Sequence, residues 1–305
     1  MAIIQWYPGH IAKLERELDH WLGLVDVVLE VRDARMPLAT TNPRLRARYG
    51  NKPSVILLNK SDLADTKQTA AWVDHLKEVE NLGVLGVNAH AIHQWKKPLE
   101  GLLKRIAAPL QAKRKQQGLK PRPVRVLVAG MPNVGKSSLI NALSGRHKAA
   151  TGHKAGVTRQ PQWVRLHETL ELLDTPGIIP PILETEMDNH ELWQTSFEQG
   201  KVQPLSIGEK LATVSSVGDA AFDEATVSTR LLSWVDEAYN GLMHTLYEVP
   251  EDVPISIESV GQARRWLTSG GGVDESRTAR QVLTDFRQGR WVKGGFGVSL
   301  EWVPE

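Results

Sequence analysis

The sequence contains no cysteine, and that absence excludes several classes of protein at once. Disulfide scaffolds, thiolate zinc sites and thiol-based catalysis all require this residue. Long hydrophobic runs are also missing. No apolar stretch approaches the ~20 residues that cross a bilayer, and the start, MAIIQWYPGH, does not have the form of a signal peptide. We therefore expect a cytoplasmic protein with no membrane partner.

The sequence also has little excess of one sign of charge over the other. The 305 residues include 37 Lys and Arg against 35 Asp and Glu, which leaves a formal net charge of +2. This balance does not indicate nucleic-acid binding, so any such binding must be inferred from local charge. Hydrophobic residues (41%) and charged residues (24%) occur as in ordinary globular proteins, which excludes disordered and fibrous chains.

Short β-branched runs alternate with helical stretches in the first part of the chain. Strands are predicted at residues 24–31, 54–58, 84–87, 124–129 and 169–173. Helices are predicted at residues 11–22, 67–80, 98–107 and 136–143. This alternation predicts an α/β fold with a doubly wound, parallel sheet. We assign it to a first domain, residues 1–181.

The pattern changes after this domain. Residues 182–208 are acidic and weakly periodic, which favours a solvent-facing loop over a protein-contact element. Residues 209–305 are predicted to form an α-helical domain, with helices at 209–223, 225–246, 257–268 and 275–288.

A basic segment, residues 110–123, lies within the first domain. It contains five Lys or Arg residues, two prolines and no acidic residue. An exposed linker is the simpler interpretation, and a phosphate-binding arm is the alternative.

Residues 130–137 read GMPNVGKS and fit the phosphate-binding pattern G-x-x-x-x-G-K-[ST]. They follow a predicted strand and open a predicted helix, where backbone N–H groups can surround a phosphate. Lys136 is expected to reach the β- and γ-phosphates of a nucleotide, and the Ser137 hydroxyl to bind Mg²⁺. The nucleotide-binding residues predicted here are Asn133, Val134, Gly135, Lys136, Ser137 and Ser138.

A DTPG motif follows at residues 174–177, at the end of the apolar run LELL. Asp174 is expected in the coordination shell of Mg²⁺, and the N–H of Gly177 is expected to meet the γ-phosphate. Between the two motifs, Thr158 can close over the same Mg²⁺ and phosphate.

The sequence NKSD, residues 59–62, follows another predicted strand and suits a guanine base. Asp62 can accept two hydrogen bonds from guanine, Asn59 can brace the loop, and Lys60 can cover the ring. Adenine lacks that pair of donors, so the site predicts GTP and GDP as ligands. At Asn88 and Ala89 the next strand ends, and a backbone N–H there is expected to meet the guanine oxygen.

These motifs stand in an unusual order. In a conventional GTPase the phosphate loop comes first, whereas here NKSD and Asn88-Ala89 precede it. The chain is therefore predicted to be circularly permuted, with residues 110–123 joining the former termini. Permutation preserves a fold whose termini lie close together.

Taken together, the segments WYPGH (6–10), VRDAR (31–35), NKSD, GMPNVGKSS, GVTR and DTPGI resemble the ribosome-biogenesis GTPase A family. The resemblance implies a GTP-hydrolysing P-loop enzyme that assists late assembly of the large ribosomal subunit. It implies large-subunit precursors and rRNA as partners, rather than DNA, with the C-terminal helices on rRNA.

The same resemblance implies roles for two more residues. Ile178 occupies the position after DTPG, where small GTPases carry a water-orienting glutamine, and the family assigns that task to the histidine of the WYPGH motif, His10. Asn133 resembles an asparagine that helps related GTPases bind K⁺. Without the resemblance, the basic side chains of the last 45 residues fit a solvated helix face as well as RNA. A GTP-dependent switch that acts on a protein effector is the alternative function.

Overall fold

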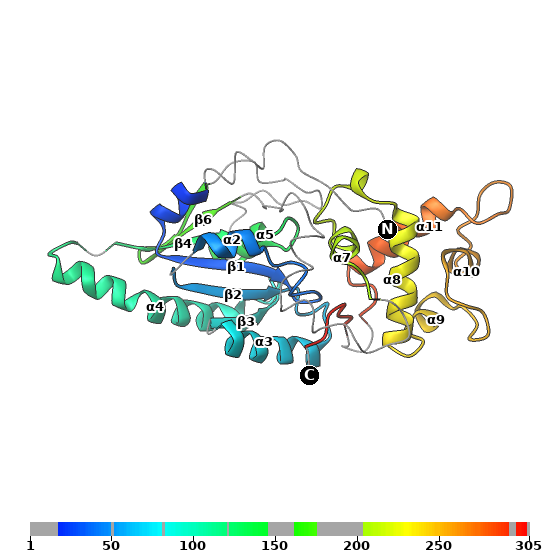
Figure 1. Ribbon diagram of the computed structural model, residues 1–305, viewed down its shortest axis with the longest axis horizontal. Helices are drawn as coiled ribbons and strands as arrows, with labels where there is room; N and C mark the ends of the chain where they lie inside the picture. The colour runs from blue at the N-terminus through cyan, green and yellow to red at the C-terminus, as the bar shows by residue number, and fades with distance from the viewer. Residues whose placement is uncertain are drawn as a thin grey trace.

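The structure is a computed structural model that describes residues 18–49, 52–80, 83–120, 122–145, 162–175, 204–292 and 297–303. These residues form a unit built on a β-sheet and a helical unit, which lie side by side along the long axis of the molecule (Figure 1). None of the helices described is long and apolar enough to cross a membrane. The motif WYPGH, the motif GVTR and most of the acidic segment lie outside the described residues.

The described residues form a six-stranded sheet in the order β3-β2-β1-β4-β6-β5. Their bounds are β1 (Val27–Asp33), β2 (Ser54–Asn59), β3 (Gly83–Val87), β4 (Val124–Ala129), β5 (Gln162–His167) and β6 (Leu170–Asp174). All neighbouring strands pair in parallel except β5 and β6, which are antiparallel. Every residue of β1 and β2 is buried, which is typical of parallel strands covered on both faces.

Helices α2 (Pro43–Tyr49), α3 (Thr66–Glu80), α4 (Ile92–Gln116) and α5 (Lys136–Ser144) belong to this unit. Helices α3 and α4 pack beside the edge strand β3, while α5 packs near β5 and β6. In α4 the buried residues Trp95, Leu99, Leu103 and Ala107 recur every four positions, so one stripe of the helix faces the core.

The helical unit contains α7 (Ile207–Thr213), a short 3₁₀ helix (Asp219–Ala221), α8 (Glu224–Ala238), α9 (Leu242–Tyr247), α10 (Ile257–Ala263) and α11 (Glu275–Arg287). Side-chain caps fix several helix starts. Ser206 and Glu209 form a reciprocal capping box on α7, and Asp274 caps α11. Helix α8 packs against α7, α9, α10 and α11 and is the centre of the unit.

The C-terminal residues 297–303 return to the sheet unit and fasten the two units together. The backbone N–H of Val298 donates to Leu63, and that of Leu300 donates to Arg35. The buried carboxylate of Glu301 accepts hydrogen bonds from the N–H groups of Leu38 and Ala39. It also pairs at 3.1 Å with Lys210 of α7, so one carboxylate joins both units.

Several predicted elements need correction. The helix expected at 98–107 is longer, because α4 covers Ile92–Gln116 and includes Pro98 and Pro109. The first seven residues of the basic segment 110–123 are therefore helical rather than a loose linker. The helix expected at 225–246 is divided, since Asn240 and Gly241 adopt left-handed conformations between α8 and α9.

Three further boundaries were also wrong. The helix expected at 209–223 ends at Thr213, because Ser215 takes a left-handed conformation. The first strand begins three residues late, at Val27, and residue 24 still belongs to a helix. Strand β5 and helix α2 were not predicted. Strand β5 has only one buried residue, Val164, so it lacks an apolar run, and α2 is only seven residues long.

Candidate nucleotide site

The phosphate-binding loop joins β4 to α5, as the sequence predicts. Gly130 and Gly135 both have positive φ angles, of 147° and 97°. A Cβ atom on Gly130 would collide with the carbonyl oxygen of Val31, and one on Gly135 would collide with the side-chain amide of Asn59. The two glycines therefore let the loop close tightly against the ends of β1 and β2.

Lys136 begins α5 and is buried inside this loop. Its Nζ donates to the carbonyl oxygens of Gly130, at 3.2 Å, and Met131, at 2.9 Å. Burial lowers the pKa of Lys136 to about 8, while the charge of Asp174 acts in the opposite direction. A bound phosphate would stabilise the ammonium form further, so the group suits an anion.

Asp174 ends β6 and is fully buried. The pairing of β6 with β4 places Asp174 opposite Val128, and the hydroxyl of Thr175 donates to the carbonyl oxygen of Val128 at 2.7 Å. A carboxylate and the Ser137 hydroxyl are oxygen donors of the kind that Mg²⁺ takes together with nucleotide phosphates. No group of three or more His, Cys, Asp or Glu residues within the described ranges could hold a metal alone. The residues present thus fit Mg²⁺ delivered with a nucleotide.

The NKSD loop is attached directly to the phosphate loop. The side-chain amide of Asn59 donates to the carbonyl oxygen of Val134 at 2.8 Å. The ammonium group of Lys60 donates to the carbonyl oxygen of Asn133, also at 2.8 Å. Both Lys60 and Asn133 adopt left-handed backbone conformations, with φ near 60°. The two loops are separated by some 70 residues in sequence and are held in register by these bonds.

A buried acceptor remains open at this junction. Oδ1 of Asn59 is buried and accepts no hydrogen bond from the described part of the chain. Leaving such an atom unsatisfied costs about 1–3 kcal/mol. This is the pattern expected at a place where a ligand supplies the missing donor.

Asp33 is a residue of this site to which the sequence motifs assigned no role. It ends β1, is fully buried, and accepts hydrogen bonds from Lys60 at 2.9 Å and from Arg35 at 2.8 Å. Burial alone would raise the pKa of Asp33, but Arg35 and Lys60 outweigh it and hold the pKa well below its usual range. In the sequence, Asp33 is visible only as an acid between two arginines in VRDAR. That pattern does not reveal that Lys60, 27 residues later, is its partner.

The other predicted residues of the base site lie nearby. Asp62 is exposed in the turn after Lys60. The carbonyl oxygen of Asn88 accepts the indole N–H of Trp95 at 2.7 Å, and Oδ1 of Asn88 accepts the N–H of His90. These bonds fix the turn that follows β3 and contains Ala89. Because β2 and β3 are neighbouring parallel strands, this turn lies next to the end of β2.

The helical unit contacts the phosphate loop. The side-chain amide of Asn133 donates to the carbonyl oxygen of Ser215 at 2.6 Å, and the hydroxyl of Ser216 donates to that of Pro132 at 2.7 Å. Asn133 is therefore part of a contact between the two units. Its role in binding K⁺ stays a prediction, and His10, Thr158 and Gly177 lie outside the described residues.

Comparison with known proteins agrees with this geometry. Residues 125–214 match a family described as 50S ribosome-binding GTPase. The chain is 35% identical to ribosome biogenesis GTPase A of Bacillus licheniformis over 93% of this chain and 94% of that protein. It is 34% identical to the protein of that name from Bacillus cereus, with 98% and 95% covered. The chain belongs to the ribosome biogenesis GTPase A family.

Solved structures agree with this membership. A structure described as GDP-bound TM YlqF aligns with a TM-score of 0.60 and 26% identity, covering 94% of this chain and 99% of that one. A GNP-bound structure of YlqF from T. maritima aligns with a TM-score of 0.54 and 25% identity, covering 95% and 100%. The predicted resemblance to the ribosome biogenesis GTPase A family is confirmed, as are the α/β P-loop fold and the GTPase class of enzyme.

Proposed function

We propose that this protein binds Mg·GTP, hydrolyses it, and acts as an assembly factor for the large ribosomal subunit in the cytoplasm. The pair of hydrogen bonds from Asn59 and Lys60 to the phosphate loop carries the nucleotide part of this proposal. They join a loop suited to guanine to a loop suited to phosphate, so that one ligand spans both. The names of the relatives from Bacillus support the ribosomal part.

Each predicted residue has a defined task in this proposal. Asp62 accepts the guanine N–H groups, and the turn at Asn88 and Ala89 offers a backbone N–H to the guanine oxygen. Lys136 and the backbone N–H groups of Asn133, Val134, Gly135, Ser137 and Ser138 hold the phosphates. Ser137, Thr158 and Asp174 would hold Mg²⁺, which would neutralise charge that develops on the phosphates. Gly177 closes on the γ-phosphate, and Asn133 is the candidate ligand of K⁺.

Hydrolysis requires a group that orients the attacking water. We assign this task to His10, because Ile178 at the usual position has no polar atom with which to do so. The segments that contain Thr158 and Gly177 are then expected to change conformation on hydrolysis, and this change should weaken association with the ribosomal particle.

We also propose that the helical unit contacts rRNA, but its arginines differ in availability. Arg287 donates to the carbonyl oxygens of Thr213 and Ala212 and so caps the end of α7. Arg264 pairs with Glu248, and Arg290 pairs with Asp285 at 2.7 Å. Arg265 and Arg277 are better placed for phosphate, since no carboxylate within the described ranges forms an ion pair with either. Arg287 is therefore left out of the proposed RNA contacts, although it belongs to the basic last 45 residues.

Gradient sedimentation tests the whole proposal. The protein is mixed with purified large-subunit particles together with GDP or a non-hydrolysable GTP analogue, and its position in the gradient is measured. Migration with the particles that depends on the GTP analogue supports an assembly factor. Recovery only with soluble protein under both nucleotides contradicts it, and favours a switch that acts on a protein effector.

A further inference from the structure

Helix α4 concentrates positive charge on one element of the sheet unit. Its 25 residues include seven Lys or Arg residues and a single acid, Glu100. Except for the half-buried Lys96 and Arg114, the cations are exposed: Lys97, Lys104, Arg105, Lys113 and Lys115. A net charge of this size on one helix is unusual in a chain whose total is +2.

Three of these exposed cations have no acid beside them in the described part of the chain. Within the ranges that the structure describes, no carboxylate lies at ion-pair distance from Lys97, Lys104 or Arg105, whereas the helical unit pairs Arg264, Arg280 and Arg290 with acids. Lys113 and Lys115 have a local explanation, because cations near the end of a helix interact favourably with its dipole. Lys97 lies in the second turn of α4, and Lys104 and Arg105 lie near its middle. The helix dipole does not favour a cation at these positions, so their charge points to an external partner.

The spacing of these side chains suits an extended polyanion. Lys97 and Lys104 are seven residues apart, or two helical turns, which places them on one face about 10 Å from each other. Lys115 follows on the same face about 16 Å further along. The buried stripe that begins at Trp95 occupies the opposite side of the helix, so this basic ridge faces solvent.

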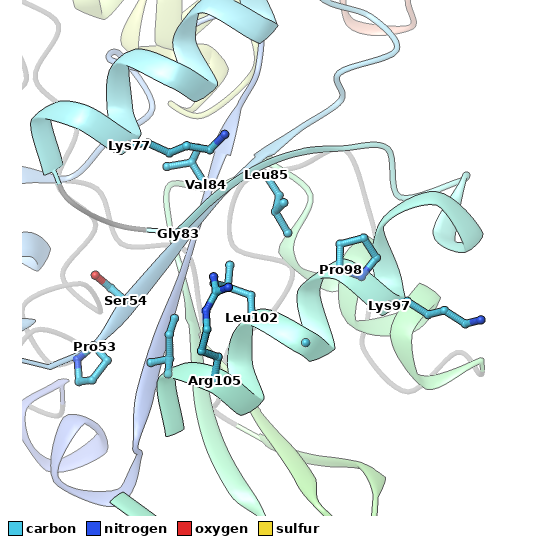
Figure 2. Close-up of a pocket in the computed structure, with 12 residues that line it drawn as sticks. Pro53, Ser54, Lys77, Gly83, Val84, Leu85, Lys97, Pro98, Leu102 and Arg105 are labelled. Atoms are coloured by element: carbon cyan, nitrogen blue, oxygen red, sulfur yellow. The ribbon is translucent and has the colours of Figure 1, made fainter. Parts of the chain in front are cut away.

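A groove lies beside the basic ridge, between α4, α3 and the edge strand β3. Its volume is about 880 Å³. Figure 2 shows the residues that line it. Lys97 and Arg105 of α4 and Lys77 of α3 stand around it, and Leu102, Val84 and Leu85 supply apolar surface. Among the residues that the structure describes, no aromatic side chain lines it, so those residues offer no ring on which unpaired bases could stack. The groove and ridge together fit a phosphate backbone better than they fit base-specific readout.

The position of α4 in the molecule adds to this interpretation. Helix α4 reaches the end of the sheet unit that is remote from the helical unit (Figure 1). A contact on α4 and a contact on the helical unit would therefore touch a large RNA at two separated places. Two linked contacts raise the overall affinity well above that of either one, provided both can be engaged at once.

We propose that the exposed face of α4, centred on Lys97, Lys104 and Arg105, is a second RNA-binding surface that holds the phosphate backbone of ribosomal RNA. This inference rests on the proposed function, because it takes the large-subunit particle as the partner. It extends that function to the GTPase unit, whereas the family resemblance implied rRNA contacts in the C-terminal helices. Binding by this surface depends on charge and tolerates any RNA sequence.

The test replaces Lys97, Lys104 and Arg105 with Gln in the full-length protein. Binding to rRNA extracted from large-subunit particles is measured by fluorescence anisotropy at several salt concentrations. Loss of three phosphate contacts should make the negative slope of log K against log salt shallower by about 2 to 3, and should weaken binding at least about tenfold near 0.1 M salt. Guanine-nucleotide affinity and basal GTP hydrolysis should be unchanged, since none of the three residues belongs to the nucleotide site.

A charge-conserving variant is the matched control. This control carries Lys97→Arg, Lys104→Arg and Arg105→Lys. Because the same three side chains change but keep their charge, the control should bind like the wild type. Glu100→Gln should bind more tightly, because it removes the one acid of the helix. Unchanged affinity and salt slope in the triple Gln variant would overturn the proposal.

Two other results also decide the matter. If the triple Gln variant loses binding to intact particles but binds extracted rRNA normally, the surface serves a ribosomal protein and the RNA assignment is wrong. If the wild-type protein binds neither particles nor rRNA, the proposed function fails first. If the wild type binds and all variants bind equally, the proposed function survives and only the role of α4 is lost.

Discussion

The ammonium nitrogen of Lys60 lies 2.9 Å from a carboxylate oxygen of Asp33, at the junction of the base loop and the phosphate loop. Asp33 holds Arg35 on its other side, and Arg35 donates to the carbonyl oxygen of Phe286 in the helical unit. One buried carboxylate therefore connects the nucleotide site to the contact between the two units.

Asp33→Asn should weaken guanine-nucleotide binding and destabilise the protein. The substitution leaves Arg35 and Lys60 without their buried counter-charge, and breaking a buried pair from one side costs about 3–5 kcal/mol. Nucleotide affinity should fall about tenfold, or about 1.4 kcal/mol. Urea unfolding and nucleotide titration measure the two effects. Asp19→Asn is the control, because its pair with Arg48 is exposed and worth about 0–1 kcal/mol.

The contribution of Asp33 to stability should depend on pH. Its pKa in the folded protein lies below its unfolded value of about 3.9. A depressed pKa stabilises the folded state above the unfolded pKa, and that stability is lost as the pH falls toward the folded pKa. The stability difference between wild type and Asp33→Asn should therefore be full near pH 6 and shrink from about pH 4 downward. A difference that stays constant down to pH 3 would contradict this assignment.

Asp62→Asn should shift nucleotide preference from guanine to xanthine. An amide replaces one acceptor with a donor, so it no longer matches both N–H groups of guanine but can meet the extra oxygen of xanthine. Competition between GTP and XTP for each protein measures the shift. The guanine assignment fails if the wild-type protein binds ATP as tightly as GTP.

Glu301→Gln should loosen the attachment of residues 297–303. Glu301 and Lys210 are both almost fully buried, so the variant removes the carboxylate that pairs with a buried ammonium group, at a cost of about 3–5 kcal/mol. Adding Lys210→Met to this variant removes the stranded charge and should restore part of the loss. Urea unfolding of both variants measures this, with the exposed Glu251→Gln as a control. Equal stability of all these proteins would show that the tail does not fasten the two units.

His10→Ala should slow GTP hydrolysis while nucleotide affinity stays nearly the same. In the proposed site the binding free energy would come from the phosphate loop, Mg²⁺ and Asp62, whereas orientation of the water is felt mainly in the transition state. A positioning or acid–base role is typically worth about 10²–10⁴-fold. Single-turnover hydrolysis in the presence of large-subunit particles is the decisive assay. Equal rates for variant and wild type would remove His10 from the mechanism.

The nucleotide motifs could be predicted from the sequence because their chemistry is local. A buried strand, a glycine loop and a helix start at Lys136 adjoin one another in the chain, and NKSD likewise follows β2 directly. Their order alone indicated the permutation. The parallel sheet followed from apolar runs whose burial requires helices on both faces. Strand β5 was not predicted, because it has one buried residue and no apolar run.

Only the tertiary structure decided how distant residues combine. Asp33 meets Lys60 because β1 and β2 are neighbouring parallel strands that end at the same edge of the sheet. Glu301 meets Lys210 because the C-terminal residues return across the junction of the two units, and nothing in their spacing reveals it. Arg287 and Arg105 are both basic residues on helices. Arg287 caps α7, whereas Arg105 is exposed and forms no ion pair with a carboxylate in the described part of the chain. The sequence determined which positions carry a charged side chain. Packing of the folded chain decided whether each charged side chain already has a partner within the protein.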